Sequence, residues 1–159
     1  MTSEHFSSRI EEMTQTLHRV TYTQLNRSCD REDAVGACLL KAWEKRNQLK
    51  EERFFQTWLI RILLNECHNI QRKNKRIVLA EDIEVAAAIP QTPQDKELRD
   101  TLTELEEKLR LPIILHYIEG YSIDEVAKIL RLPQGTIKSR MARGRKKLQS
   151  MLQEEVFEG

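Results

Sequence analysis

The chain has 159 residues, of which 32% are charged and only 6% aromatic, and its 26 basic and 25 acidic side chains leave a net charge of +1. This length suits one ordinary domain or two small ones, and the balanced charge excludes a chain coated in basic residues. No run approaches the roughly 20 apolar residues of a membrane span, and the N-terminus lacks the pattern of a signal peptide. These features predict a cytoplasmic protein that does not insert into a membrane.

Three apolar stripes occupy the first half of the chain. The first runs from Phe6 to Val20 in steps of four and three, the second lies within 35–43, and the third covers 55–70 before the sequence turns basic. Such spacing places apolar side chains on one face of a helix, and the scarcity of glycine and proline also favours helices. We therefore expect three helices that pack into a small domain over residues 1–76.

The segment 77–94 breaks this pattern. Pro90 and Pro93 prevent helix continuation, and a proline also biases the preceding residue away from the helix. The short apolar part at 77–80 fits either a strand or a docking segment. We expect this segment to be a flexible linker between two domains.

The second domain, residues 95–159, is also predicted to be helical. An acidic helix is expected over 95–109. Pro112 suits the first turn of a second helix, which would end at Gly120. The chain as a whole is thus predicted to be all-α, with two small helical domains.

The last part of the second domain is predicted to form a helix-turn-helix. Ser122-Ile123-Asp124-Glu125 forms a capping box that begins a helix, and a tight turn at 132–135 leads to a basic helix that begins near Thr136. The residues of that last helix that are predicted to point inward are Ile137, Met141, Leu148 and Leu152.

Basic residues gather in two stretches. Residues 72–76 read Arg-Lys-Asn-Lys-Arg, and residues 126–153 hold eight basic side chains and no acid. Two basic patches on a balanced chain suggest two separate contacts with a polyanion such as nucleic acid. The alternative for the last helix is a solvated basic helix of an ordinary bundle, although a merely soluble helix usually mixes charges of both signs.

The three cysteines are odd in number and widely spaced, which does not fit a disulfide framework or a zinc site. Cys38 and Cys67 fall at apolar helical positions and are predicted to be small core residues, while Cys29 lies near a helix boundary. Glu66, His68 and His116 show no metal-ligand spacing. We expect no cofactor, no metal and no catalytic residue; a metal-dependent hydrolase built around Glu66 and His68 is the least favoured alternative.

Residues 133–148, Pro-Gln-Gly-Thr-Ile-Lys-Ser-Arg-Met-Ala-Arg-Gly-Arg-Lys-Lys-Leu, resemble the helix by which extracytoplasmic-function (ECF, group 4) sigma factors of the sigma-70 family read the −35 promoter element. Residues 120–127 resemble the first helix of the same motif. The family usually reads Leu-Pro where this chain has Leu105-Glu106. The −35 DNA-binding residues that the resemblance implies are Thr136, Lys138, Ser139, Arg140, Ala142 and Arg143.

Residues 30–43 resemble the helix by which the same family grips the clamp helices of the largest polymerase subunit, through Asp-Arg-Glu-Asp-Ala-Val and then Leu-Lys-Ala-Trp. Gly36-Ala37 stands where the family commonly has Gln-Glu, so two polar contacts are missing and a glycine costs the helix about 1 kcal/mol relative to alanine. The implied core polymerase-binding residues are Asp33, Val35, Leu39 and Leu40.

Residues 55–62, with Asn65, resemble the helix by which the family reads the −10 element. The loop 49–54 before it is expected near a displaced base, and Phe54 suits either stacking on that base or a core or lid position. The implied −10 DNA-binding residues are Asn65, Asn69, Arg72, Lys73, Lys75 and Arg76.

Together these resemblances imply a sigma factor, a non-enzymatic subunit that directs transcription initiation by binding core polymerase and recognising the −10 and −35 elements. The implied partners are bacterial core RNA polymerase, promoter DNA and an anti-sigma factor. On the polymerase, the implied contacts are the clamp helices of the largest subunit and the flap of the second subunit. A stand-alone helix-turn-helix repressor is the alternative; it would need a dimer interface and would leave residues 1–76 unexplained.

Overall fold

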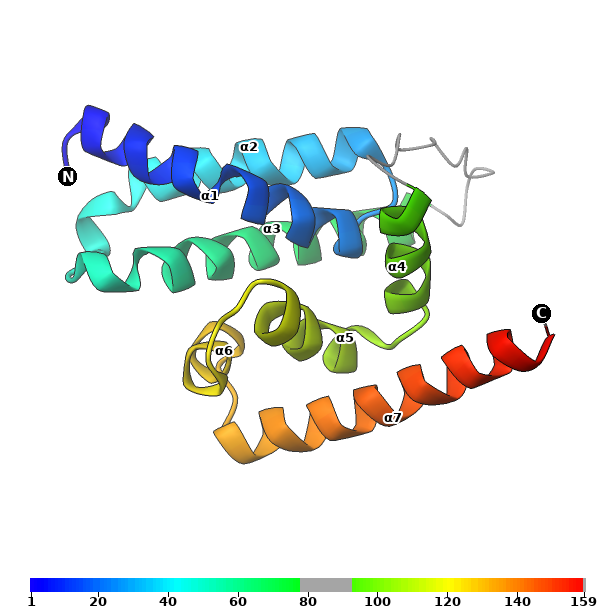
Figure 1. The fold of residues 1–159 in the computed structure, drawn as a ribbon. Helices are drawn as coiled ribbons and strands as arrows, with labels where there is room; N and C mark the ends of the chain where they lie inside the picture. The colour runs from blue at the N-terminus through cyan, green and yellow to red at the C-terminus, as the bar shows by residue number, and fades with distance from the viewer. Residues whose placement is uncertain (78–92, 159) are drawn as a thin grey trace. The chain divides into compact units, whose positions relative to one another are not determined.

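A computed structural model describes residues 1–77 and 93–158, which form two compact helical units on either side of the gap (Figure 1). The described residues contain seven α-helices, short 3-10 and π-helical turns, and no strand. No helix in them is long and apolar enough to cross a membrane. The predicted all-α fold in two small helical domains is confirmed. Residues 78–92 of the predicted linker lie outside the described residues. At its two ends, Ile77 still belongs to the preceding helix and Pro93 begins the next one.

The first unit packs three helices against one another: α1 (Ser3–Gln24), α2 (Ser28–Glu44) and α3 (Phe55–Ile77). The side chain of Thr2 caps α1 by accepting a hydrogen bond from the His5 amide, which would otherwise lack a partner. The apolar stripes predicted from the sequence form the core. Its fully buried members include Leu17, Val20, Cys38, Leu59, Leu63 and Cys67.

Two short 3-10 turns, Arg46–Gln48 and Glu52–Phe54, connect α2 to α3. Aromatic rings close this end of the unit, with Phe6 lying 5.2 Å from Trp43 and 6.2 Å from Phe55 between ring centroids. Trp43 and Trp58, which lie on the apolar stripes of their helices, are half-buried at the edge of this cluster. The first turn of α1 also reaches the connection, because His5 Nε2 lies 3.0 Å from the Glu52 carboxylate.

The second unit contains α4 (Pro93–Thr103), α5 (Glu107–Ile113) with a π-helical continuation, η3 (Ile114–Ile118), and then α6 (Ile123–Leu130) and α7 (Gln134–Glu158). The prediction of one acidic helix over 95–109 was wrong, because α4 ends at Thr103 and a separate helix, α5, begins at Glu107. Pro112 lies inside α5 and not in its first turn, so that prediction was also wrong.

Tertiary contacts explain this break. The buried guanidinium of Arg110 donates to the Leu105 carbonyl over 3.1 Å, and the Leu109 and Arg110 amides donate to the Glu106 carbonyl. Leu102, Leu105 and Leu109 are all buried, and a turn between α4 and α5 lets them share one core. The helix therefore starts before Pro112, driven by the burial of these leucines.

The predicted helix-turn-helix is present in α6 and α7. The Ser122 hydroxyl accepts from the Glu125 amide and the Glu125 carboxylate accepts from the Ser122 amide, both at 3.1 Å, which confirms the capping box. Arg131 ends α6 in the left-handed conformation, with φ at 57°. Ile137 and Met141 are buried as predicted, but Leu152 is 51% exposed, so the inward stripe of α7 stops near Leu148.

Candidate nucleic-acid interface

One face of the first three turns of α7 carries the predicted −35 residues. Burial of Ile137, Met141 and Gly144 against the rest of the unit fixes the rotation of this helix. Side chains between these positions must therefore point away from the core. Lys138, Ser139, Ala142 and Arg143 are exposed, and Thr136 and Arg140 are half-buried at the edge of the same surface.

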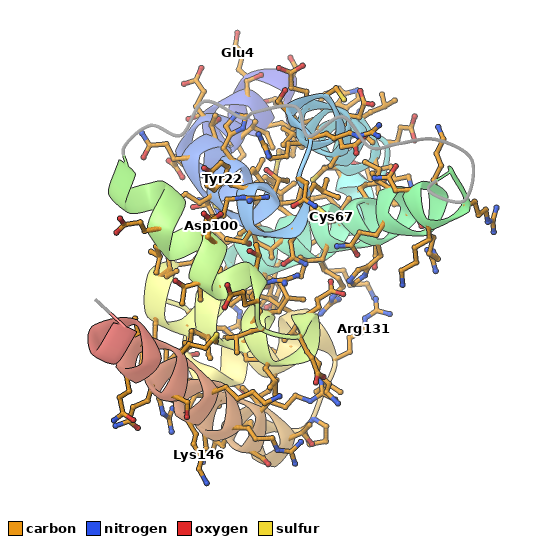
Figure 2. The ribbon with its side chains drawn as sticks, turned by 90° about the vertical axis from the view of Figure 1, so that its right-hand side faces the viewer. Glu4, Tyr22, Cys67, Asp100, Arg131 and Lys146 are labelled. Atoms are coloured by element: carbon orange, nitrogen blue, oxygen red, sulfur yellow. The ribbon has the colours of Figure 1, made fainter. Side chains whose placement is uncertain are left out.

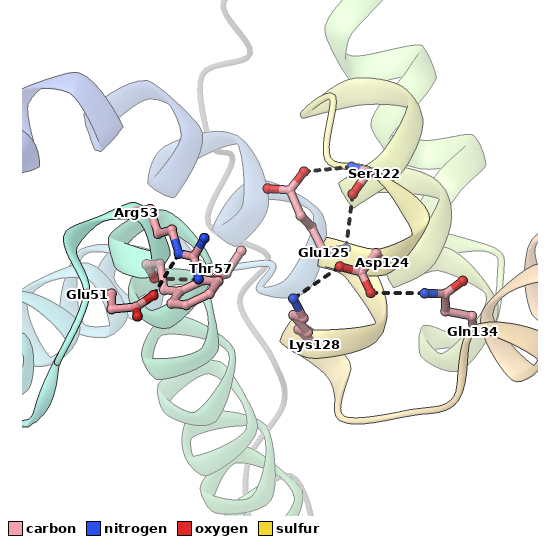
Figure 3. A network of polar contacts seen from close by, with 9 residues as sticks. Glu51, Arg53, Thr57, Ser122, Asp124, Glu125, Lys128 and Gln134 are labelled. Atoms are coloured by element: carbon pink, nitrogen blue, oxygen red, sulfur yellow. Dashed lines mark hydrogen bonds and ion pairs between the residues drawn. The ribbon is translucent and has the colours of Figure 1, made fainter.

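The connection between α6 and α7 is held by side chains of α6. The Asp124 carboxylate accepts a hydrogen bond from the side-chain amide of Gln134 over 2.9 Å and pairs with Lys128 at 3.1 Å (Figure 3). Lys128, with a smaller contribution from Gln134, holds the pKa of the Asp124 carboxyl below its usual range. Because Gln134 is the first residue of α7, these contacts tie the start of the basic helix to α6.

A shallow hollow of about 370 Å³ opens beside the basic face of α7. Five of its lining residues come from α7, and the sixth, Lys108, comes from α5. Sequence reasoning missed Lys108, because nothing in the local pattern indicates that α5 passes close to the first turns of α7. The α7 residues that line the hollow are Gly135, Thr136, Ser139, Arg140 and Arg143.

Glu106 pairs with two lysines near this surface. Its carboxylate lies 3.5 Å from Lys108 Nζ and 3.7 Å from Lys147 Nζ. The residue that replaces the family's usual proline therefore adds a negative charge at the edge of the basic surface. The side chains of α7, including the labelled Lys146, are visible in Figure 2.

The predicted −10 residues lie on the exposed side of α3. Leu59, Leu63 and Cys67 occupy the opposite, buried side. Asn69 accepts a hydrogen bond from the Arg72 guanidinium one turn later, which places both side chains on one surface. All six predicted residues are exposed: Asn65, Asn69, Arg72, Lys73, Lys75 and Arg76.

The loop before α3 presents a second set of groups. Arg53 Nε donates to the Glu51 carboxylate over 2.7 Å (Figure 3), and its guanidinium stacks 4.7 Å from the centre of the Phe54 ring. The Thr57 hydroxyl donates to the Phe54 carbonyl over 3.1 Å and anchors the loop to α3. Phe54 is half-buried, so one part of its ring remains accessible.

The predicted polymerase-binding residues lie along α2. Asp33, Gly36 and Leu40 follow one another at helical spacing and are all exposed. Leu40 is 60% exposed, which is high for a large apolar side chain. Val35 and Leu39 are half-buried beside this face.

The remaining candidates for chemistry occupy the core of the first unit. Cys38 and Cys67 are buried as predicted, and burial, more than the nearby Cys67 and Glu66, raises the pKa of the Cys38 thiol to about 12. Glu66, which a hydrolase would need as a free carboxylate, is buried and paired with Lys41. No group of His, Cys, Asp and Glu that could hold a metal ion is found in the described residues.

Family models match both halves of the chain. Residues 10–77 match the family model described as Sigma-70 region 2, and residues 95–148 match that described as Sigma-70, region 4. The chain belongs to the sigma-70 family of RNA polymerase sigma factors. Within that family it is an ECF sigma factor, a regulatory and promoter-selecting protein. The repressor alternative is not favoured, because the region 2 match accounts for the residues that a repressor leaves unexplained.

Two relatives illustrate the likeness. The chain is 31% identical to the ECF RNA polymerase sigma-E factor of Haemophilus influenzae, over 76% of this chain and 74% of the relative. It is 29% identical to the ECF RNA polymerase sigma factor SigW of Bacillus subtilis, over 87% of this chain and 83% of the relative.

Two solved structures share the fold. The sigma factor RpoE of Bartonella quintana, crystallised with the anti-sigma factor NepR, is similar with a TM-score of 0.73 and 28% identity, over 92% of this chain and 97% of that chain. CnrH, solved with the cytosolic domain of CnrY, has a TM-score of 0.78 at 24% identity, over 96% and 90% of the two chains, which shows the fold alone.

Proposed function

We propose that this sigma factor binds core RNA polymerase through α2, reads the −10 element through α3 and reads the −35 element through α7. One observation carries the proposal: on each of these helices, the residues expected to make contacts are exposed or lie half-buried at the edge of the exposed face. Because a sigma factor acts on RNA polymerase, we propose a cytoplasmic location. We also propose that it has no catalytic residue of its own.

The −35 element is proposed to contact the exposed face of α7. Arg143 and Lys138 can donate to guanine O6 and N7 in the major groove, and the Ser139 hydroxyl suits phosphate or base edges. Arg140 and Thr136 lie at the edge of the same face, where they can contact phosphates of the DNA backbone and so position the helix. Ala142 is exposed on α7 and offers a methyl group for apolar contact with thymine.

The −10 element is proposed to contact the exposed face of α3. Asn65 and Asn69 can both donate to and accept from base edges. The basic end of the helix supplies phosphate contacts, through Arg72, Lys73, Lys75 and Arg76. Phe54, whose ring contacts the Arg53 guanidinium, is proposed to stack on an unpaired base.

Core polymerase is proposed to bind α2 around Leu40, with Asp33 as a polar contact and Val35 and Leu39 as the half-buried floor. A single exposed leucine is common on protein surfaces, so the support for this site is the resemblance of α2 to the polymerase-binding helix of the family together with the exposure of Asp33 and Leu40. In the sigma-70 family this helix meets the clamp helices of the largest subunit, and region 4 meets the flap of the second subunit. Since RpoE of Bartonella quintana was crystallised with the anti-sigma factor NepR, an anti-sigma protein is proposed as the regulator here as well.

The test of this proposal uses a panel of promoters that differ at single −35 positions. Arg143→Ala and Lys138→Ala are each expected to lower transcription, and a lost base contact should cost about 1–3 kcal/mol and relax the preference at one position. Lys146→Ala, which removes an equal charge from outside the predicted contact set, is the matched control. Unchanged transcription by both variants across the whole panel would contradict the assignment.

A further inference from the structure

Lys108 lies outside the helix-turn-helix but borders its DNA-reading face. It is the second residue of α5 and lines the hollow of about 370 Å³ that otherwise belongs to α7. Its side chain is 54% exposed, so its ammonium group is accessible to a ligand that approaches α7. The hollow therefore extends the basic surface beyond the two helices of the motif.

The chemistry of the hollow matches that of a phosphate group. Three cations, Lys108, Arg140 and Arg143, line it together with the hydroxyls of Thr136 and Ser139. Cationic and hydroxyl donors are the groups that bind phosphate oxygens on DNA. The described residues that line the hollow include no acid.

Glu106 supplies the nearest counter-charge. Its ion pairs with Lys108 and Lys147 are long, at 3.5 Å and 3.7 Å, and all three side chains are more than half exposed. Ion pairs of this kind are weak and are screened by salt, so a DNA phosphate can compete with them. The carboxylate also repels a phosphate that enters the hollow.

We propose that the hollow receives one backbone phosphate of the −35 DNA, with Lys108 as a ligand from α5, and that Glu106 weakens this contact by pairing with Lys108 and Lys147. The inference rests on the proposed function, because it assumes that α7 meets the −35 element. A phosphate contact adds affinity that depends on salt and not on base sequence. Lys108 and Glu106 thus set the strength of −35 binding, while the base-facing residues of α7 set its preference.

The first experiment measures promoter binding by the reconstituted holoenzyme over a series of salt concentrations. Lys108→Ala is expected to weaken binding about threefold to tenfold and to reduce the slope of log K against log [salt] by about one, equally for all −35 sequences. Glu106→Gln is expected to strengthen binding and to make the slope steeper. Glu104→Gln removes an exposed acid of the same connection that makes no ion pair among the described residues, and it should have a smaller effect than Glu106→Gln.

The second experiment locates the phosphate. Neutral methylphosphonate is placed at one backbone position of the −35 region at a time, and binding by wild type is compared with binding by Lys108→Ala. At one position the neutral linkage should weaken wild type but hardly affect the variant, since both changes remove the same contact.

Two results would overturn the inference: an unchanged salt slope for Lys108→Ala, or losses that add independently at every methylphosphonate position. If Arg143→Ala still altered −35 preference in that case, the proposed function would stand and only the role of Lys108 would fail. If neither Lys108→Ala nor Arg143→Ala had any effect, both the role of Lys108 and the proposed function would fail.

Discussion

Gly144 of α7 packs directly against Ile113 of α5. A Cβ atom built on Gly144 would overlap Ile113 Cδ1 and would lie 3.3 Å from the Leu109 carbonyl oxygen. The missing side chain therefore lets the two helices approach closely at this point. That approach also brings Lys108, five residues before Ile113, beside the first turns of α7.

Gly144→Ala is expected to destabilise the second unit by about 1–3 kcal/mol through overpacking, although alanine is the better helix former. Chemical unfolding followed by circular dichroism measures the change. Gly135→Ala is the matched control in the same helix, because its Cβ would meet nothing within 4 Å, and it is expected to be neutral or stabilising. Equal stability for the two variants would contradict the close packing of α5 and α7.

The Asp124 carboxylate should make the helix-turn-helix sensitive to acid. Lys128 and Gln134 hold the pKa of this carboxyl low in the folded protein. Its stabilising effect is therefore fully present above the pKa of an aspartate in the unfolded chain, about 3.9, and is lost as the pH falls through the lower pKa of the folded state. Wild type is therefore expected to be more stable than Asp124→Asn near neutral pH, and the difference should vanish in strong acid. Unfolding midpoints measured from neutral pH downwards test this, and a difference that persists at the acid end would contradict it.

The face of α3 that carries Asn65 and Asn69 is expected to act on the −10 element. Replacing both by alanine should reduce promoter melting, measured by permanganate reactivity of unpaired thymines, while the buried side of the helix and hence the fold remain intact. Gln56→Ala, an exposed amide of the same helix outside the predicted set, serves as the control. Melting that is unaffected in the double variant would remove these two asparagines from the account.

The departure at Gly36-Ala37 gives a prediction in which affinity increases. Gly36 is exposed on α2 and a Cβ there would meet nothing within 4 Å, so Gly36→Gln with Ala37→Glu should be accommodated without strain at the glycine. The substitutions restore two polar side chains beside Leu40 and remove the cost of a helical glycine, about 1 kcal/mol. Competition for core polymerase against another sigma factor measures the gain. Gly36→Ala removes the cost of the helical glycine without adding a polar side chain, so it separates the two effects. Binding of the double variant no better than that of wild type would contradict the expectation.

Features with a local physical cause were predictable from the sequence. The stripe from Phe6 to Val20 specifies a helix face because apolar spacing alone determines which side is buried. The capping box at Ser122 involves residues only three positions apart. Exposure of Asn65 and Asn69 follows in the same way, because the buried stripe of α3 leaves them on the other side.

Features that depend on tertiary contacts were not predictable. The break between α4 and α5 contains no glycine or proline. It lets Leu102, Leu105 and Leu109 share one core, and that arrangement depends on how the helices of the second unit pack. The position of Lys108 beside α7 depends on how closely two helices pack at Gly144. The outward position of Leu152 depends on how far along α7 the other helices of the second unit pack, which the apolar periodicity of α7 does not show.

The central claim is that this chain gives core RNA polymerase its choice of promoter, and run-off transcription on fragmented genomic DNA from the source bacterium tests it most directly. Core polymerase is assayed with and without the purified protein, and the transcript starts are mapped. The account predicts new transcripts, present only when both components are added, whose start sites share one sequence element near −10 and another near −35. Identical transcripts in the presence and absence of the protein, with the protein failing to co-elute with core polymerase, would contradict it.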